Sequence, residues 1–215
     1  MTRDVTVPPG RIEAWFRGFE ERNGRVASIT AADGTTQVRT ERGAAVLITD
    51  PRAASARHVA ELTALLLPRE SVAVVLVRRG GYSIGRGECD GSTARLERTK
   101  TGTRYVQGRT AAGGQSQQRF ARRRANQTAA LVVDAAQAAR AVLGDRPAAV
   151  DLLVTGGDPQ LVEDLLGREP LRRLRAGRHV QVATGEPRRA SLDDALDAAR
   201  AVRLTVTNAD PEEGP

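Results

Sequence analysis

The spacing of apolar residues near the start of the chain predicts a helix. Its apolar face is formed by Ile12, Trp15, Phe16 and Phe19, the last three lying three, four and seven positions beyond the first. Two prolines precede this segment and Asn23-Gly24 ends it. Short alternating runs then predict strands at 26–30, 35–40 and 44–48, and a second helix covers about 52–67. We therefore expect a small N-terminal α+β extension over residues 1–68.

The hydrophobic pattern changes after residue 70. Residues 72–77 are apolar throughout, which is typical of a strand covered on both faces, and further strands are predicted at 82–86 and 93–99. Residues 101–114 lack periodicity and are rich in Gly and Thr, so we expect a mobile loop there. A long helix is predicted over about 116–143, and only its second half is apolar enough for a core.

The rest of the chain alternates between strands and helices. Strands are predicted at 150–154 and 180–183; one helix follows Asp158-Pro159 and another follows a capping box formed by Ser191 and Asp194. Three meandering strands, a helix, a strand, a helix and a strand is the order of an RNase H-like mixed sheet. We thus predict an α/β domain over 69–207 and a disordered tail over 208–215.

The distribution of charge along the chain gives the first indication of function. The chain has 33 Lys and Arg against 26 Asp and Glu, and Lys100 is its only lysine. Eight of the basic residues lie within 98–133, which contains no acid, and removing them leaves 25 basic against 26 acidic residues. The basic excess is therefore confined to one segment, which predicts contact with a polyanion such as RNA.

Several classes of function are not supported by the composition. Cys89 is the only cysteine, and with His58 and His179 it does not make a zinc site, so we expect neither a metal nor a cofactor. There is no apolar run of about 18 residues and no secretory h-region. We expect a cytoplasmic protein that does not bind membranes; the oligomeric state is not indicated.

The junction between the predicted loop and the long helix carries the sequence Gly113-Gly114-Gln115. Consecutive glycines let the backbone approach a partner closely. Arg119, Arg122 and Arg123 follow at helical spacing on one face, which Arg124 is expected to widen. The pattern predicts a Gly-Gly-Gln tip in front of a phosphate-binding stem.

Residues 113–124, preceded by Lys100-Thr101-Gly102, resemble the catalytic loop of the Vms-type (VLRF) release factors. These are peptidyl-tRNA hydrolases related to the middle domain of eukaryotic class I release factors. The resemblance covers about 71–206, is sharp only over 100–127, and implies an RNase H-like fold. Compared with full-length class I factors, we expect no separate stop-codon-reading domain in this sequence. Compared with the eukaryotic Vms-type proteins, we expect no zinc finger, ankyrin repeats or other appended module.

The resemblance implies hydrolysis of peptidyl-tRNA on stalled ribosomal complexes, independent of the codon, in ribosome rescue or quality control. Gln115 has no proton to exchange near pH 7, so its amide would orient a water against the ester carbonyl, with Gly113 and Gly114 beside it. The partners implied are the large ribosomal subunit and peptidyl-tRNA. The predicted tRNA and rRNA contacts are Lys100, Arg104, Arg109, Arg119, Arg122, Arg123 and Arg124.

Two other functions remain open at this stage. An RNase H-like nuclease would need carboxylates on its central strands, and 72–77 has none. A non-catalytic ribosome- or RNA-binding module would use the same basic stem, with the glycines serving only as a hinge. A second basic cluster (Arg172, Arg173, Arg175 and Arg178) is either a solvated face or another RNA contact, and 155–158 is expected to be a capped turn.

Overall fold

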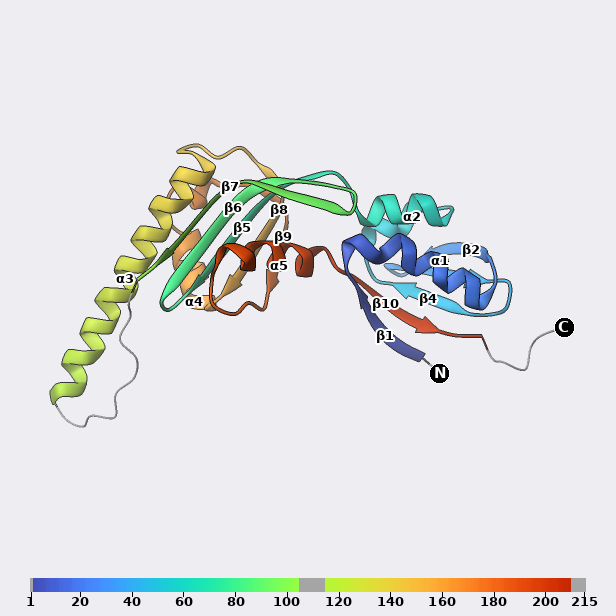
Figure 1. The fold of residues 1–215 in the computed structure, drawn as a ribbon, viewed down its shortest axis with the longest axis horizontal. Helices are drawn as coiled ribbons and strands as arrows, with labels where there is room; N and C mark the ends of the chain where they lie inside the picture. Colours follow the sequence, from blue (N-terminus) through green and yellow to red (C-terminus); the bar gives the residue numbers. More distant parts are fainter. Residues whose placement is uncertain (1, 105–114, 210–215) are drawn as a thin grey trace. The chain divides into compact units, whose positions relative to one another are not determined.

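The computed structural model describes residues 2–104 and 115–209 and divides into two compact units (Figure 1). The first unit comprises Met1–Arg69, Asp90–Thr93 and Arg200–Pro215, and the second comprises Glu70–Cys89 and Ala94–Ala199. Residues 1, 105–114 and 210–215 lie outside the described part, so the predicted disorder of the tail beyond Ala209 stays a prediction.

The first unit is an antiparallel sheet with two helices. Its strands have the order β1-β10-β4-β3-β2. Its elements are β1 (Thr2–Val7), a 3-10 turn (Pro9–Arg11), α1 (Ile12–Asn23), β2 (Val26–Ala32), β3 (Thr35–Thr40), β4 (Ala45–Ile48), a 3-10 turn (Pro51–Ser55), α2 (Val59–Leu66) and β10 (Val202–Thr207). The three strands predicted between residues 26 and 48 are all present.

The core of this unit is formed where α1 packs on the sheet. Ile12, Phe16 and Phe19 are fully buried, as their spacing predicts. The Trp15 ring lies parallel to that of Phe19 with centroids 5.4 Å apart, and edge-on to Phe16 at 5.1 Å. Burial of these rings therefore holds α1 in place and explains the apolar face of the sequence.

Two expectations for this unit are wrong. The helix predicted over 52–67 is divided, because Asp50 caps the 3-10 turn through the Arg52 N–H and His58 caps α2 through the Glu61 N–H. The strand β10, which has no counterpart among the predicted elements, pairs with β1 and β4. Residues 202–207 thus belong to the first sheet, which differs from the predicted domain span of 69–207.

The second unit is a mixed sheet of order β7-β6-β5-β8-β9. Its elements are β5 (Glu70–Arg78), β6 (Gly81–Asp90), β7 (Thr93–Thr103), α3 (Gln115–Leu143), β8 (Val150–Gly157), α4 (Pro159–Leu166), a 3-10 turn (Leu171–Arg173), β9 (Ala176–Val182) and α5 (Arg189–Arg200). β5 is antiparallel to β6 and parallel to β8, which is parallel to β9. The predicted RNase H-like α/β sheet is confirmed.

Helices cover both faces of this sheet (Figure 1). From β5, Ala73, Val75 and Val77 pack against α3 and α4. The alternate residues Val72, Val74 and Leu76 pack against α5. This is why the strand is apolar at every one of these positions: each side chain reaches one of two separate cores.

Only one of the two helix caps predicted for this unit is present. Asp158 caps α4 by accepting hydrogen bonds from the Gln160 and Leu161 N–H groups, as the sequence predicts. The capping box predicted at Ser191 is wrong. α5 begins at Arg189, and the Ser191 hydroxyl instead donates to the Glu186 carbonyl and accepts from the Arg188 N–H. Ser191 therefore lies within the first turn of α5 and stabilises the turn that precedes the helix.

We predict that burial of the inner half of α3, from Leu131 onward, contributes strongly to the free energy of unfolding of the second unit. Leu131→Ala removes a fully buried side chain and should lower the free energy of unfolding by about 2–5 kcal/mol. Val133→Ala is the matched control, because Val133 lies on the same helix but is 41% exposed. Its effect should stay within about 0.5 kcal/mol in urea unfolding followed by circular dichroism. Equal effects of the two substitutions would contradict this packing.

Candidate functional site

The two halves of α3 have opposite surroundings. From Leu131 onward the helix buries Leu131, Ala135, Ala138 and Val142 against the sheet. Between residues 118 and 130 every side chain that the structure describes is exposed or half-buried. Since a helix rises 1.5 Å per residue, the outer half from Gln115 projects about 24 Å from its buried part (Figure 1).

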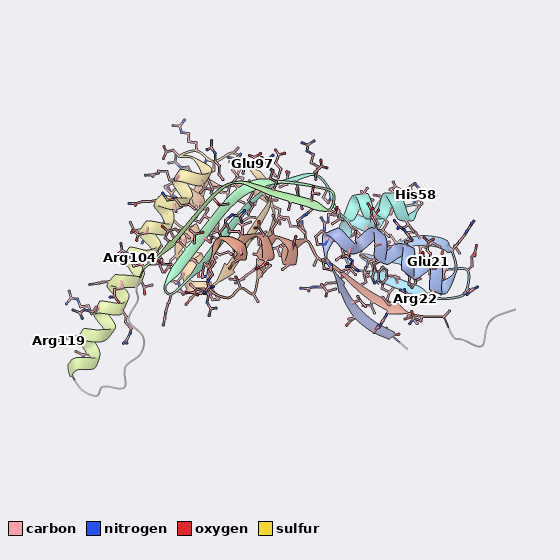
Figure 2. All side chains as sticks on the ribbon, viewed as in Figure 1. Glu21, Arg22, His58, Glu97, Arg104 and Arg119 are labelled. Carbon is pink, nitrogen blue, oxygen red and sulfur yellow. The ribbon has the colours of Figure 1, made fainter. Side chains whose placement is uncertain are left out.

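The arginines of this outer half lie on two sides of the helix. Successive residues turn by about 100°, so Arg119, Arg122 and Arg123 share one side while Arg124 lies about 150° from its centre. The first three are exposed and Arg124 is half-buried. Arg119 stands on the projecting half in Figure 2. The expectation that Arg124 widens the same face is therefore wrong.

The charges of the outer half are not neutralised locally. Among the described residues, none of Arg119, Arg122 and Arg123 is paired with a carboxylate, and the first turn of α3 contains no acid. Lys100, on β7, is also exposed. These side chains therefore present their full positive charge to solvent, as a site for phosphates requires.

Arg104 has a different environment from the other predicted contacts. Its Nε lies 2.7 Å from Oδ2 of Asp134 on α3, and its backbone N–H donates to the Gly80 carbonyl at 2.9 Å (Figure 2). The two side chains are 43% and 32% exposed, so the pair contributes about 0.2–1 kcal/mol. Arg104 thus ties the end of β7 to the inner half of α3.

The end of β7 also packs closely on β6. A Cβ on Gly102 would collide with the Tyr82 ring, and the Ser83 and Thr101 hydroxyls lie 2.6 Å apart. These contacts extend β7 to Thr103, into the segment where the sequence predicts a mobile loop. Burial, followed by the nearby Asp134 charge, raises the pKa of Tyr82, while Arg104 opposes the shift. Tyr82 is therefore neutral near pH 7.

The predicted catalytic tip lies at the edge of the described structure. Gln115 is the first residue of α3, and nothing is described of its side chain. Gly113, Gly114 and Arg109 lie outside the described residues. The roles given to these four residues remain predictions, although their place in the chain puts the tip directly before the projecting half of α3.

The second basic cluster is largely paired with carboxylates. Arg172 and Arg173 contact Oε1 of Glu169 at 2.8 and 3.1 Å, and Arg178 lies 3.2 Å from the buried Glu70. Hydrogen bonding from Arg172, with the two arginine charges, lowers the pKa of Glu169 despite its desolvation. This arrangement favours a structural role for the cluster over RNA contact.

Other candidate groups have structural surroundings. Cys89 is buried in the core beneath α5, and His179 Nε2 lies 2.8 Å from the Thr155 hydroxyl. Within the described ranges, no three His, Cys, Asp or Glu side chains gather where a metal could bind. None of the helices described is long and apolar enough to cross a membrane.

Two residues beside α3 are not predicted from the sequence as site residues. Arg79, in the turn after β5, and Arg168, after α4, line a groove with Arg124. No local signal marks either residue, because they lie 45 and 44 positions from Arg124 in the chain. The packing of α4 against both α3 and β5 brings the three together.

Comparison with known proteins identifies a family. A family model described as Actinobacteria/chloroflexi VLRF1 release factor matches residues 70–205, which is more than half of the chain. No curated protein matches the chain. The matched span includes the second sheet, the basic segment 98–133 and every residue of the candidate site.

We predict that Arg122 and Arg104 differ in their contribution to RNA affinity. Arg122→Gln should weaken binding and make the log-log salt slope shallower by about 0.7 to 0.9, because it removes an unpaired charge. The double variant Arg104→Gln/Asp134→Asn removes a paired charge and leaves the net charge unchanged, so RNA affinity should stay near that of the parent protein. The measurement is fluorescence anisotropy with labelled tRNA over a salt series. If the double variant weakens binding as much as Arg122→Gln does, Arg104 itself contacts RNA.

Proposed function

The chain belongs to the VLRF1 release factor family, and on this premise we propose that it hydrolyses peptidyl-tRNA and frees nascent chains from stalled ribosomal complexes. The family membership confirms the resemblance inferred from residues 113–124, and release factors act in translation on the ribosome and tRNA. The observation that carries the proposal is that Gln115 begins α3, whose projecting outer half carries arginines without carboxylate partners among the described residues.

The proposed chemistry follows from the groups at this tip. The Gln115 amide oxygen accepts a hydrogen bond from water and orients it, because an amide exchanges no proton near pH 7. The water oxygen attacks the ester carbonyl carbon, the bond from that carbon to the ribose oxygen breaks, and the ribose oxygen takes up a proton. A free peptide acid and a deacylated tRNA are the products.

Backbone groups at the tip suit the charge that develops in this reaction. The first N–H groups of a helix have no partner within it, and the positive end of its dipole favours an oxyanion. Gly113 and Gly114 have no side chain to keep the backbone away from the ester. The remaining groups of the active site would come from ribosomal RNA and the terminal ribose.

The shape of α3 supports action inside a confined RNA site. A single helix is about 10–12 Å across, far narrower than the unit that bears it. Its unpaired arginines would contact phosphates on the way to the ester on the large subunit, while the buried inner half stays with the sheet. In this proposal the arginines of the outer half bind RNA, and Gln115 at the start of the same helix takes part in the reaction.

The proposal predicts that Gln115→Ala lowers the rate of peptide release by about 10²-fold or more, while affinity for the ribosomal complex stays nearly unchanged. Release of labelled peptide from ribosome-bound peptidyl-tRNA is the measurement. Gln118→Ala is the matched control, because Gln118 is exposed on the same helix. Parent-like release by Gln115→Ala would refute the catalytic role. A parent protein that binds the complex without releasing peptide would favour the non-catalytic module.

A second prediction separates this reaction from termination and from RNA cleavage. Release should proceed with either a sense or a stop codon in the A site, and the tRNA should remain full length on a denaturing gel. A chelator selective for transition metals, with magnesium kept in place, should not slow release. Dependence on a stop codon would indicate an ordinary termination factor, and a shortened tRNA would indicate a nuclease.

A further inference from the structure

We propose that Arg79, Arg124 and Arg168 form a site for an RNA phosphodiester backbone in the groove between α3 and α4. The groove has a volume of about 420 Å³ and lies entirely within the second unit. This inference rests on the proposed function for its ligand, and it assigns a binding role to two arginines outside the basic segment 98–133.

Three separate elements supply the guanidinium groups. Arg124 comes from the outer half of α3, Arg79 from the turn between β5 and β6, and Arg168 from the end of α4. The groove side of α3 carries Ala125, Thr128 and Ala129 next to Arg124. The alanines leave room between the helices, and the Thr128 hydroxyl adds a neutral hydrogen-bond donor.

The charges around the groove are only partly compensated. Arg124 and Arg168 have no carboxylate partner among the residues that the structure describes. The Nε of Arg79 is 3.9 Å from Oδ2 of Asp158, at the limit of an ion pair, and the Arg79 side chain is 68% exposed. Of the described carboxylates, that of Asp164 lines the groove, and it accepts a hydrogen bond from the Gln160 amide at 3.2 Å.

These groups match phosphate in chemistry. A guanidinium presents a planar set of N–H donors that binds phosphate oxygens in pairs. The three arginines outnumber the two nearby carboxylates, Asp164 in the groove and Asp158 beside Arg79. In the second basic cluster, by contrast, Glu169 engages Arg172 and Arg173. Arg124 and Arg168 therefore remain available for an external anion.

The position of the groove favours a chain of phosphates over a single ion. Arg122 precedes Ala129 by seven positions, so the two lie only about 20° apart around the axis of α3, and the basic side of the outer half adjoins the groove. In the opposite direction, a second hollow of about 350 Å³, which Arg168 also lines, contains Glu169 and Arg140. Arg140 is paired with Asp145 at 2.7 Å. Unpaired positive charge therefore continues from the groove toward the proposed catalytic tip.

The test compares charge-matched variants of the full chain. Arg79→Gln/Arg168→Gln should bind RNA more weakly than the parent protein, with a salt slope shallower by about 0.7 to 0.9 for each phosphate that is no longer neutralised. Arg95→Gln/Arg146→Gln is the control, because both residues are exposed arginines of the second unit that do not line the groove. Thermal melting followed by circular dichroism checks that the variants fold. Equal affinities and slopes for the two double variants would overturn the proposal.

Two probes identify the source of the phosphates. A deacylated acceptor-stem minihelix reports on tRNA, and large ribosomal subunits without tRNA report on rRNA. Weaker binding of either probe by the groove variant supports the site and names its ligand. Displacement of both RNAs by submillimolar inorganic phosphate at constant ionic strength would show a site for the free anion and would overturn the assignment to a backbone.

The binding measurement keeps this proposal separate from the proposed function. It needs no peptide release, so a parent protein without hydrolase activity would leave the groove testable. Gln115→Ala should retain RNA affinity in the same assay, whereas the Arg79→Gln/Arg168→Gln variant should lose it. Loss of affinity in Gln115→Ala alone would place RNA binding at the tip and overturn the groove.

Discussion

Burial of the inner half of α3 against the second sheet supports the outer half, which has little stability of its own. Each large aliphatic side chain buried there contributes about 1.5–3 kcal/mol. In the outer half, Arg119 lies three and four positions before Arg122 and Arg123, and like charges at this spacing repel. Basic residues near a helix N-terminus also oppose the helix dipole. Because helix propagation is easier than nucleation, the buried half provides the nucleus from which this unfavourable segment extends.

This arrangement lowers helix stability and places positive charge at the projecting end. A helix optimised only for stability would carry acids in its first turn, and this one has none. Elsewhere in the second unit, several arginines lie beside carboxylates, as Arg104 does with Asp134 and Arg178 does with Glu70. On the outer half of α3, by contrast, Arg119, Arg122 and Arg123 have no carboxylate partner among the described residues. The positive charge of the outer half thus directly follows the Gly-Gly-Gln motif in the sequence.

The first unit has a core of its own, built from the α1 aromatics and the alternating apolar residues of its sheet. β1 and β10 pair along their full lengths, from Thr2 opposite Thr207 to Val7 opposite Val202. β10 therefore lies between β1 and β4 and connects β1 to the rest of the sheet. The family match extends to residue 205, so it includes part of a strand that belongs structurally to this first unit.

The sequence by itself determined the features that depend on neighbouring residues: the doubly covered strand β5, the long helix with unlike halves, the Asp158 cap and the segregation of basic charge. Each of these features is indicated by the local spacing of apolar residues, by a capping residue or by the number of charged residues in a segment. Only the tertiary structure shows that β10 joins the first sheet and that Arg104 forms an ion pair with Asp134. It also shows that Arg79 and Arg168 lie beside Arg124. These depend on which distant elements pack together. A short strand or an exposed arginine has the same local pattern whichever partner it meets, so its role is settled only when the whole chain has folded.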